Sequence, residues 1–356
     1  MRKAITVLAA LICVALGSTA QPARSAAVFI EPGARATLVF VDLATGEEQS
    51  VQTDGSVFAV LNDSVMTYDP STRSVVLIGA DGRSRPHPFI TLGAQDARVD
   101  WAISADGKRI AWTITQGGAG MLTTVTRVAD VSGEAQRIVF EETRTDGLRA
   151  RPVAFSPDDS ILYLDYQPDG LDTLMLFPQF AGLFQLDLSA EHPGDTFAFL
   201  PGEPGDFTGA GFGSGYFLRL AVSQQAGGFD VRVVRLATGT EWSIPASNSG
   251  GYSIAGDVLV APDGRFAVYA QTALSGLGSG SAQTSTVIMR VDLTEMTQTP
   301  LTVPQEGVLR PVAWTENDGA VLLISPNRAG TWKVRISDGR VQQVAQLTYL
   351  GQISET

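Results

Sequence analysis

One pattern recurs along the chain: two short apolar runs joined by a turn of small, acidic and glycine residues. The clearest copy occupies residues 99–113, with Asp106 and Gly107 in the turn. Further copies lie at residues 152–163, 258–268 and 311–322. Paired apolar runs about an Asp-Gly or Pro-Asp turn indicate β-hairpins, and their regular return indicates a repeat array.

The spacing of these hairpins reveals two degenerate copies. Successive turns are separated by about 50 residues, a period typical of propeller blades. A double interval separates residues 152–163 from residues 258–268, and a glycine-rich copy at residues 209–222 lies midway. Residues 57–68 form another copy, one shorter period before the first. The chain therefore holds six copies of the hairpin.

A second motif follows the hairpins: an apolar strand, a turn and another strand. Examples are residues 184–188, 233–242, 289–295 and 334–341. Each period therefore holds four strands, and no convincing helical period appears after Ala26. The sequence predicts an all-β chain folded as a β-propeller of four-stranded blades.

The two ends of the chain leave unpaired strands. Residues 27–48 precede the first hairpin, and residues 347–353 form a single strand after the sixth copy. The economical interpretation is that the C-terminal strand begins a seventh blade and the N-terminal segment completes it. This closure would protect both sheet edges from aggregation. Six blades with an additional N-terminal hairpin is the alternative.

The Ser-Ala/Pro-Asp-Gly/Asp hairpins, above all residues 102–112, resemble the WD40-like (TolB-type) propeller repeat of bacterial secreted proteins. The resemblance covers nearly all of the chain after its N-terminal segment, repeat by repeat. It implies the propeller fold and an exported protein. The Gly-His and Trp-Asp pairs of true WD40 repeats are absent from the sequence.

The N-terminus has the three parts of a secretory signal. Arg2 and Lys3 precede an apolar run at residues 4–17, and small residues follow at 18–20. We expect residues 1–20 to be a signal peptide cleaved after Ala20, leaving residues 21–356 as a single propeller domain outside the cytoplasm. The apolar run is short for a bilayer span, so no stable membrane insertion is expected after cleavage. The single cysteine, Cys13, would leave with the signal.

The composition of the chain and the motifs that it lacks argue against several classes of function. The 25 basic and 37 acidic residues give a net charge of −12, which argues against nucleic acid as a partner. The sequence has no Gly-x-Ser-x-Gly elbow and no Gly-x-Gly-x-x-Gly motif, and its two histidines are isolated. The Asp-Gly turns lack the alternating oxygens of a calcium loop. The sequence therefore predicts no catalytic residue, no cofactor and no metal.

Two arginines are candidates for ligand binding. Arg151 and Arg310 each precede a Pro-Val-Ala-aromatic run that should form the innermost strand of a blade, beside the central channel. A guanidinium group there could bind a carboxylate or phosphate. The alternative is that both arginines form salt bridges with local acids or are simply solvated.

An apolar insertion at residues 171–182 is the candidate site for a partner. We predict that an exported, non-catalytic binding or scaffolding propeller engages a protein or peptide through it, with the anchors Leu174, Met175, Phe177 and Phe180. The segment packing over its own channel mouth is equally compatible with the sequence. An enzyme or small-anion-binding propeller that uses the channel mouth is the alternative function. The sequence sets no oligomeric state.

Overall fold

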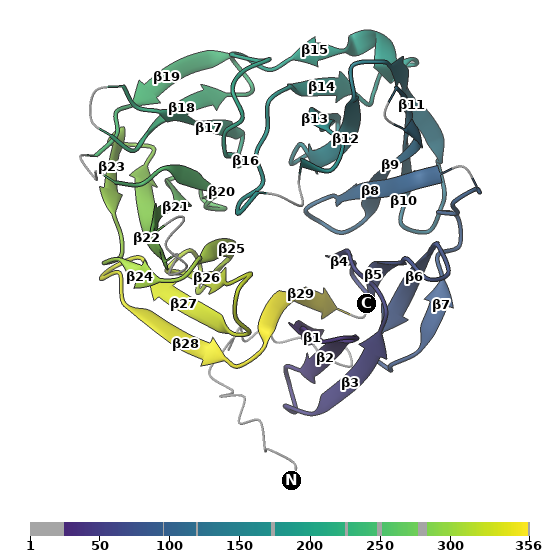
Figure 1. Cartoon of the computed structure of the whole chain (residues 1–356), viewed down its shortest axis with the longest axis horizontal. Coiled ribbons are helices and arrows are strands. Elements are labelled where there is room, and N and C mark those ends of the chain that lie inside the picture. Colours follow the sequence, from purple (N-terminus) through teal and green to yellow (C-terminus); the bar gives the residue numbers. More distant parts are fainter. Residues whose placement is uncertain are drawn as a thin grey trace, which may run out of the picture.

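A computed structural model describes residues 25–94, 96–118, 120–171, 175–224, 227–247, 251–276 and 283–354. Seven antiparallel sheets form a closed ring, which Figure 1 shows face-on. The prediction of an all-β propeller with seven four-stranded blades is therefore confirmed, and the six-blade alternative is wrong. The predicted signal peptide lies outside the described residues.

The first three blades come from the N-terminal part of the chain, together with the last strand. Blade 1 comprises β29 (Thr348–Ser354), β1 (Ser25–Glu31), β2 (Ala36–Asp42) and β3 (Glu48–Thr53). Blade 2 comprises β4 (Phe58–Val60), β5 (Ser64–Asp69), β6 (Ser74–Gly79) and β7 (Ser84–Pro86). Blade 3 comprises β8 (Asp96–Ile103), β9 (Arg109–Gly118), β10 (Met121–Asp130) and β11 (Arg137–Arg144).

The other four blades follow in chain order. Blade 4 comprises β12 (Leu148–Phe155), β13 (Ile161–Pro168), β14 (Leu183–Asp187) and β15 (Ala198–Phe199), with the 3-10 helix η2 (Pro193–Thr196) before β15. Blade 5 comprises β16 (Ala210–Gly213), β17 (Tyr216–Val222), β18 (Phe229–Arg235) and β19 (Thr240–Ile244). Blade 6 comprises β20 (Ile254–Val260), β21 (Phe266–Ser275), β22 (Gln283–Asp292) and β23 (Thr297–Pro300), with β24 (Gln305–Glu306) also paired to β22. Blade 7 comprises β25 (Arg310–Thr315), β26 (Ala320–Ile324), β27 (Thr331–Arg335) and β28 (Val341–Ala345).

The ring closes through its two ends, as the sequence predicted. The C-terminal strand β29 is the innermost strand of blade 1 and lies beside β1 in Figure 1. Their antiparallel register runs from Ser25 opposite Ser354 to Ile30 opposite Thr348. Blade 1 thus joins strands from both ends of the chain, and unfolding at one end removes the partner of the other.

The Ser-x-Asp-Gly turn between β8 and β9 is closed by its own side chains. The Ser104 hydroxyl donates to Asp106 Oδ1 over 2.8 Å and accepts from the N–H of Arg109 over 2.9 Å. Asp106 Oδ1 also accepts from the N–H of Lys108 over 3.0 Å. Gly107 adopts a φ of 69°, which glycine tolerates without strain. Ser156 and Asp158 make the same contacts in the β12–β13 turn of blade 4, so these residue types satisfy the turn locally.

The core lies in the seams between blades. Each hydrophobic cluster joins neighbouring blades, as in the cluster of Leu218, Val231 and Tyr269 between blades 5 and 6. At this seam the innermost strands β16 and β20 approach backbone to backbone. A Cβ atom on Gly211 would come within 2.1 Å of the Val258 carbonyl oxygen. The glycine-rich copy of the repeat is therefore required by the close contact of two blades.

Candidate functional site

The predicted insertion links β13 to β14 and turns inward, toward β16 and β20 (Figure 1). Phe180 and Thr208 exchange backbone hydrogen bonds over 2.9 and 3.2 Å, which ties the loop to the segment before β16. The Gln179 side-chain amide donates to the Ala255 carbonyl oxygen over 3.0 Å. The loop of blade 4 is thus fastened to blades 5 and 6.

Two of the four predicted anchors are buried in the protein itself. Phe177 is 1% exposed and packs against β20, where a Cβ atom on Gly256 would lie 2.4 Å from the Phe177 Cβ. Phe180 is 8% exposed and fills the seam between blades 4 and 5 with Tyr163 and Phe217. Both rings hold the loop in place, so neither is an exposed anchor here. Their part of the segment packs on its own propeller.

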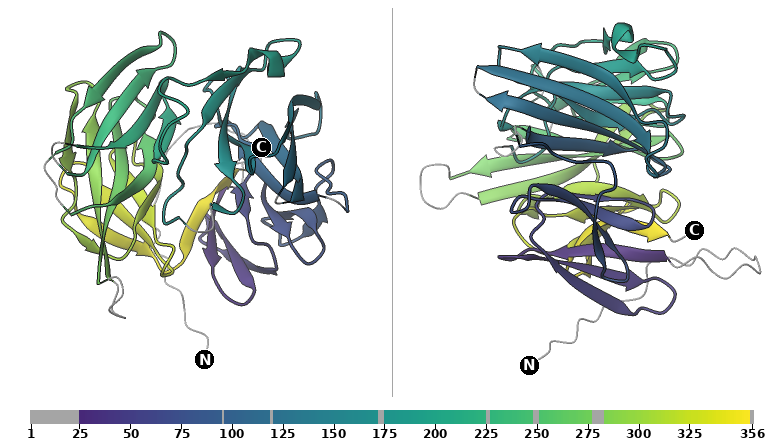
Figure 2. Two further views of the ribbon diagram at one scale, coloured as in Figure 1. Left: turned by 45° about the horizontal axis from the view of Figure 1, so that its top comes forward. Right: turned by 90° about the vertical axis from the view of Figure 1, so that its right-hand side faces the viewer.

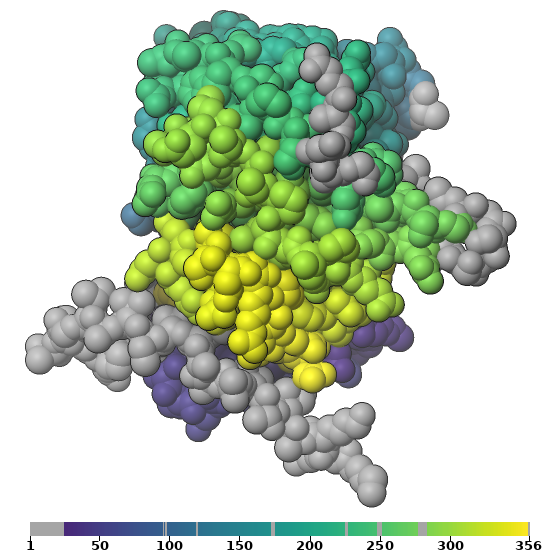
Figure 3. Space-filling model, turned by 90° about the vertical axis from the view of Figure 1, so that its left-hand side faces the viewer, coloured from purple at the N-terminus to yellow at the C-terminus, as the bar shows by residue number. Residues whose placement is uncertain are grey.

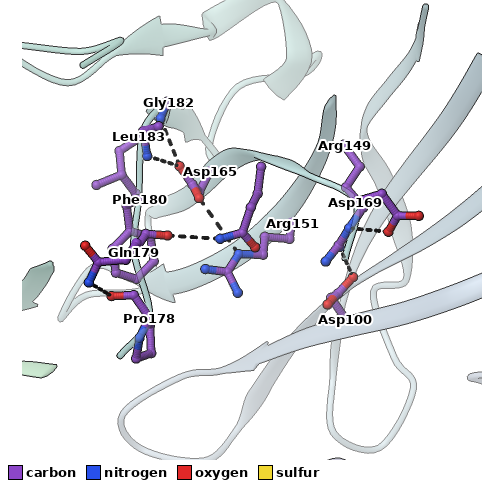
Figure 4. A network of polar contacts seen from close by, with 12 residues as sticks. Asp100, Arg149, Arg151, Asp165, Asp169, Pro178, Gln179, Phe180, Gly182 and Leu183 are labelled. Carbon is purple, nitrogen blue, oxygen red and sulfur yellow. Dashed lines mark hydrogen bonds and ion pairs between the residues drawn. The ribbon is translucent and has the colours of Figure 1, made fainter. Parts of the chain in front are cut away.

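A buried carboxylate supports the same loop (Figure 4). Asp165 of β13 is fully buried, and its Oδ1 accepts the N–H groups of Ala181 over 3.2 Å and Gly182 over 3.0 Å. The Gln167 side chain donates to the Gln179 carbonyl oxygen over 2.9 Å. Burial raises the pKa of Asp165 to about 6, although the two N–H groups and Arg151 act in the opposite direction. The loop backbone is thereby satisfied by side chains of blade 4.

The two candidate arginines lie on innermost strands, as expected, and each faces a carboxylate. Arg151 of β12 is directly opposite Asp165 in the strand register, with its Nε 3.9 Å from Asp165 Oδ2, and it stacks on Phe180 (Figure 4). Arg310 of β25 forms a bidentate pair with Asp257 of β20 over 2.6 and 2.9 Å. The guanidinium groups therefore join neighbouring structural elements.

Sequence reasoning missed a third channel arginine, Arg149. It precedes Arg151 by two residues on β12, so the strand alternation was a usable signal. Arg149 is fully buried and pairs with Asp100 of blade 3, and its Nε lies 3.2 Å from Asp169 Oδ1 (Figure 4). These contacts join blades 3 and 4.

Beside the loop lies an apolar groove of about 430 Å³. Its apolar lining comes from the loop and from blades 5 and 6, and no charged side chain of the described residues contributes to it. The lining includes Met175, Leu176, Phe207, Val222, Ile254 and Leu274. Met175 is 38% exposed, Phe207 43% and Val222 68%, so this surface faces solvent. We call it the Met175 groove.

One side of the Met175 groove is formed by the β21–β22 hairpin. Leu274 lies near the end of β21, and the β21–β22 hairpin projects beyond the ring (Figures 2 and 3). Phe207 and Val222 lie in other segments and were not predicted, because Phe207 is a single apolar residue in a polar stretch and Val222 is the last residue of an ordinary apolar strand. The fourth predicted anchor, Leu174, lies outside the described residues, directly before Met175.

The described residues offer few groups for metal binding or acid–base chemistry. No group of three or more histidine, cysteine, aspartate or glutamate side chains in these residues could hold a metal ion. His87 is buried, its Nδ1 accepts the N–H of Ile90 over 3.1 Å, and burial lowers its pKa to about 4. His192 occupies the N-cap position of the short helix η2, and its side chain makes no capping hydrogen bond there. Within the described ranges, no helix is long and apolar enough to cross a membrane.

Comparison with known proteins supports the fold and goes no further. No protein-family model and no curated protein matches the chain. Prolyl oligopeptidase B from Galerina marginata is 11% identical, with a TM-score of 0.50 over 86% of this chain and 44% of that one. Hydrazine synthase from Kuenenia stuttgartiensis is 12% identical, with a TM-score of 0.49 over 79% and 76%. At 11% identity the likeness to prolyl oligopeptidase B concerns the fold alone. The seven antiparallel sheets of the described residues make this chain a seven-bladed β-propeller.

Proposed function

We propose that this chain is an exported, non-catalytic binding or scaffolding propeller that engages a protein or peptide segment through the Met175 groove. The observation that carries the proposal is the solvent-facing apolar surface of Met175, Phe207 and Val222 beside a projecting hairpin. Exposed apolar surface contributed by several elements is typical of interaction sites. We also assign the repeats to the WD40-like (TolB-type) family as part of this proposal.

The occupant we propose is an extended segment with one or two large apolar side chains and basic flanking residues. The groove offers mainly apolar surface, which suits apolar side chains of a polypeptide better than a small ion. The net charge of −12 would favour a positively charged partner during encounter. Met175 and Phe207 would be the main contacts.

The proposal places the protein outside the cytoplasm, in the periplasm, on the cell surface or in the medium. Its support is the sequence of residues 1–20, with Arg2 and Lys3 before the apolar run and a small-residue cleavage site at Ala20. The alternative, an enzyme or anion-binding protein at the channel mouth, has less support. Arg151 and Arg310 each face an acid of this chain, which is the arrangement of structural ion pairs.

A matched pair of double variants tests the groove. Met175→Ser with Phe207→Ser removes two exposed groove side chains, and Met121→Ser with Phe199→Ser makes the same changes at exposed positions on blades 3 and 4. Tagged proteins would be used to capture partners from envelope and culture fractions of the native host. The proposal expects one protein to be retained by the wild type and the control but lost with the groove variant. Retention by all three proteins would contradict it.

A further inference from the structure

A second cavity, of about 270 Å³, lies between blades 2 and 3, away from the Met175 groove. The connection between β7 and β8 supplies Phe89 and Thr91 to its wall, and blade 3 supplies the rest. Arg127 is directly opposite Trp112 in the β9–β10 register. Residues paired in this way project from the same face of a sheet, so the guanidinium group and the indole share the cavity.

Arg127 differs from the other arginines of the described chain. Almost all of them contact a carboxylate, a carbonyl oxygen or an aromatic ring through the guanidinium group. Arg127, Arg232 and Arg340 make no such contact within the described residues, and only Arg127 is half-buried. A partly desolvated guanidinium without a partner is unfavourable, and its planar fork matches a carboxylate in bidentate geometry.

The carboxylate that lines the same cavity, Asp96, already has hydrogen-bond partners within the protein. Asp96 is buried, its Oδ1 accepts from the Gln116 side-chain amide over 2.6 Å, and its Oδ2 accepts from the N–H of Gly93 over 2.5 Å. No ion pair joins Asp96 to Arg127 in this described region. The negative charge of Asp96 nearby favours a singly charged ligand over a phosphate dianion, because each added charge meets repulsion.

The other polar residues that line this cavity are suited to bind the hydroxyl groups of a small cyclic ligand. Thr91, Gln116 and Gln136 bring a hydroxyl and two amides, which both donate and accept hydrogen bonds. The Phe89 ring lies 5.4 Å from the ring of the buried Trp112, tilted by 50°, and forms an apolar wall. The cavity volume of about 270 Å³ lies just below the range of drug-sized sites.

We infer that this cavity binds a small hydroxylated carboxylate, a sugar acid or hydroxy acid, whose carboxylate is clamped by Arg127. The amides and the hydroxyl hold its hydroxyl groups, and Phe89 covers the apolar side of its carbon skeleton. This binding site is independent of the Met175 groove, because the two share no residue and belong to different blades.

Isothermal titration of the full chain with glucuronate, galacturonate and gluconate tests the inference. Glucose serves as the uncharged match for glucuronate, and inorganic phosphate serves as the non-carboxylate anion. We expect saturable binding of at least one carboxylate, and weak or absent binding of glucose and phosphate. No saturable binding of any of the three carboxylates would overturn the inference, as would glucose binding as tightly as glucuronate.

Variants of Arg127 then test whether its guanidinium group binds the carboxylate of the ligand. Arg127→Gln should weaken carboxylate binding by about tenfold or more, because the bidentate charge-assisted contact is lost. Arg232→Gln, at an exposed arginine on blade 5, should leave it unchanged. If Arg127→Gln fails to fold, Arg127→Lys keeps the charge without the fork and should also bind more weakly. Unchanged affinity in the folded Arg127 variant would overturn the assignment.

Discussion

Phe177 of the β13–β14 loop lies against Gly256 of β20, so closely that a Cβ atom on residue 256 would come within 2.4 Å of the phenylalanine Cβ. The two residues belong to blades 4 and 6, with blade 5 between them in the chain. A loop of one blade is thus seated on the innermost strand of another. This contact holds Met175 at the edge of the apolar groove.

The contact predicts non-additive stability effects. Gly256→Ala should destabilise the protein by about 1–3 kcal/mol, because the added methyl group overpacks the contact with Phe177. Phe177→Gly should cost at least the roughly 3–5 kcal/mol of a buried phenylalanine truncation. In the Phe177→Gly background, Gly256→Ala should cost clearly less, since the Phe177 Cβ that the new methyl group would meet is gone. Urea unfolding of the four proteins measures this coupling, and strictly additive changes would contradict the contact.

Closure of the ring through β29 predicts that the C-terminal strand is structural. Truncation after Gln346 removes the buried residues Leu347 and Ile353 and exposes the edge of β1. The melting temperature should fall by several degrees or more, because the lost burial costs several kcal/mol. Removal of Glu355 and Thr356 alone is the control and should have little effect. An unchanged melting curve for the longer truncation would contradict the closure.

Burial of Asp165 predicts a specific pH dependence. Its folded-state pKa of about 6 lies above the ordinary value of 3.8, so the folded protein holds this proton more tightly than the unfolded chain does. Asp165 therefore favours folding most at low pH, and this contribution is lost as the pH rises from about 4 through about 6. Asp165→Asn should remove the loss and be at least as stable as the wild type at pH 8, with a difference on the order of 2 kcal/mol.

Asp158, in the turn between β12 and β13, provides the control of opposite sign. Hydrogen bonds from Ser156 and Ser160 lower its pKa to about 2, so its contribution is present above pH 3.8 and lost in acid. Asp158→Asn should therefore be less stable than the wild type at neutral pH. Unfolding curves across this pH range compare both variants. A less stable Asp165→Asn protein at pH 8 would show that the carboxylate is favourable there.

The export proposal predicts a defined mature N-terminus. Protein purified from the native host should begin at Gln21, because cleavage is expected after Ala20. N-terminal sequencing of the envelope and culture fractions measures this directly. An intact Met1, or a lipid attached to Cys13, would refute the predicted cleavage.

The fold was predictable because its signals are local. The Ser104 hydroxyl and the Asp106 carboxylate close their own turn, so the clear copies of the hairpin motif are visible in the sequence and their spacing locates the degenerate ones. The site was predictable only in part. Met175 lies in an apolar segment that stands out in the sequence, whereas Phe207 and Val222 reach the groove only when blades 5 and 6 assemble. Nothing local marked either the isolated Phe207 or the last residue of β17 as part of a surface site.

The roles of Phe177, Phe180 and Arg151 could not be predicted either, because they depend on contacts with other strands. In the sequence, Phe177 and Phe180 are apolar residues of the same segment as Met175. Their burial depends on the surfaces of other blades. Arg151 was correctly expected on an innermost strand. Its acidic partner, Asp165, is set by the β12–β13 register, which a bulge between Pro152 and Ala154 shifts.

The central claim is that a partner polypeptide occupies the Met175 groove in the native host. Site-specific photo-crosslinking tests it most directly, with a photoreactive amino acid in place of Met175 and, as the matched control, in place of the exposed Met121 on blade 3. The account predicts a discrete crosslinked product of higher mass from position 175 that is absent from position 121. No product from position 175, or the same product from both positions, would contradict it.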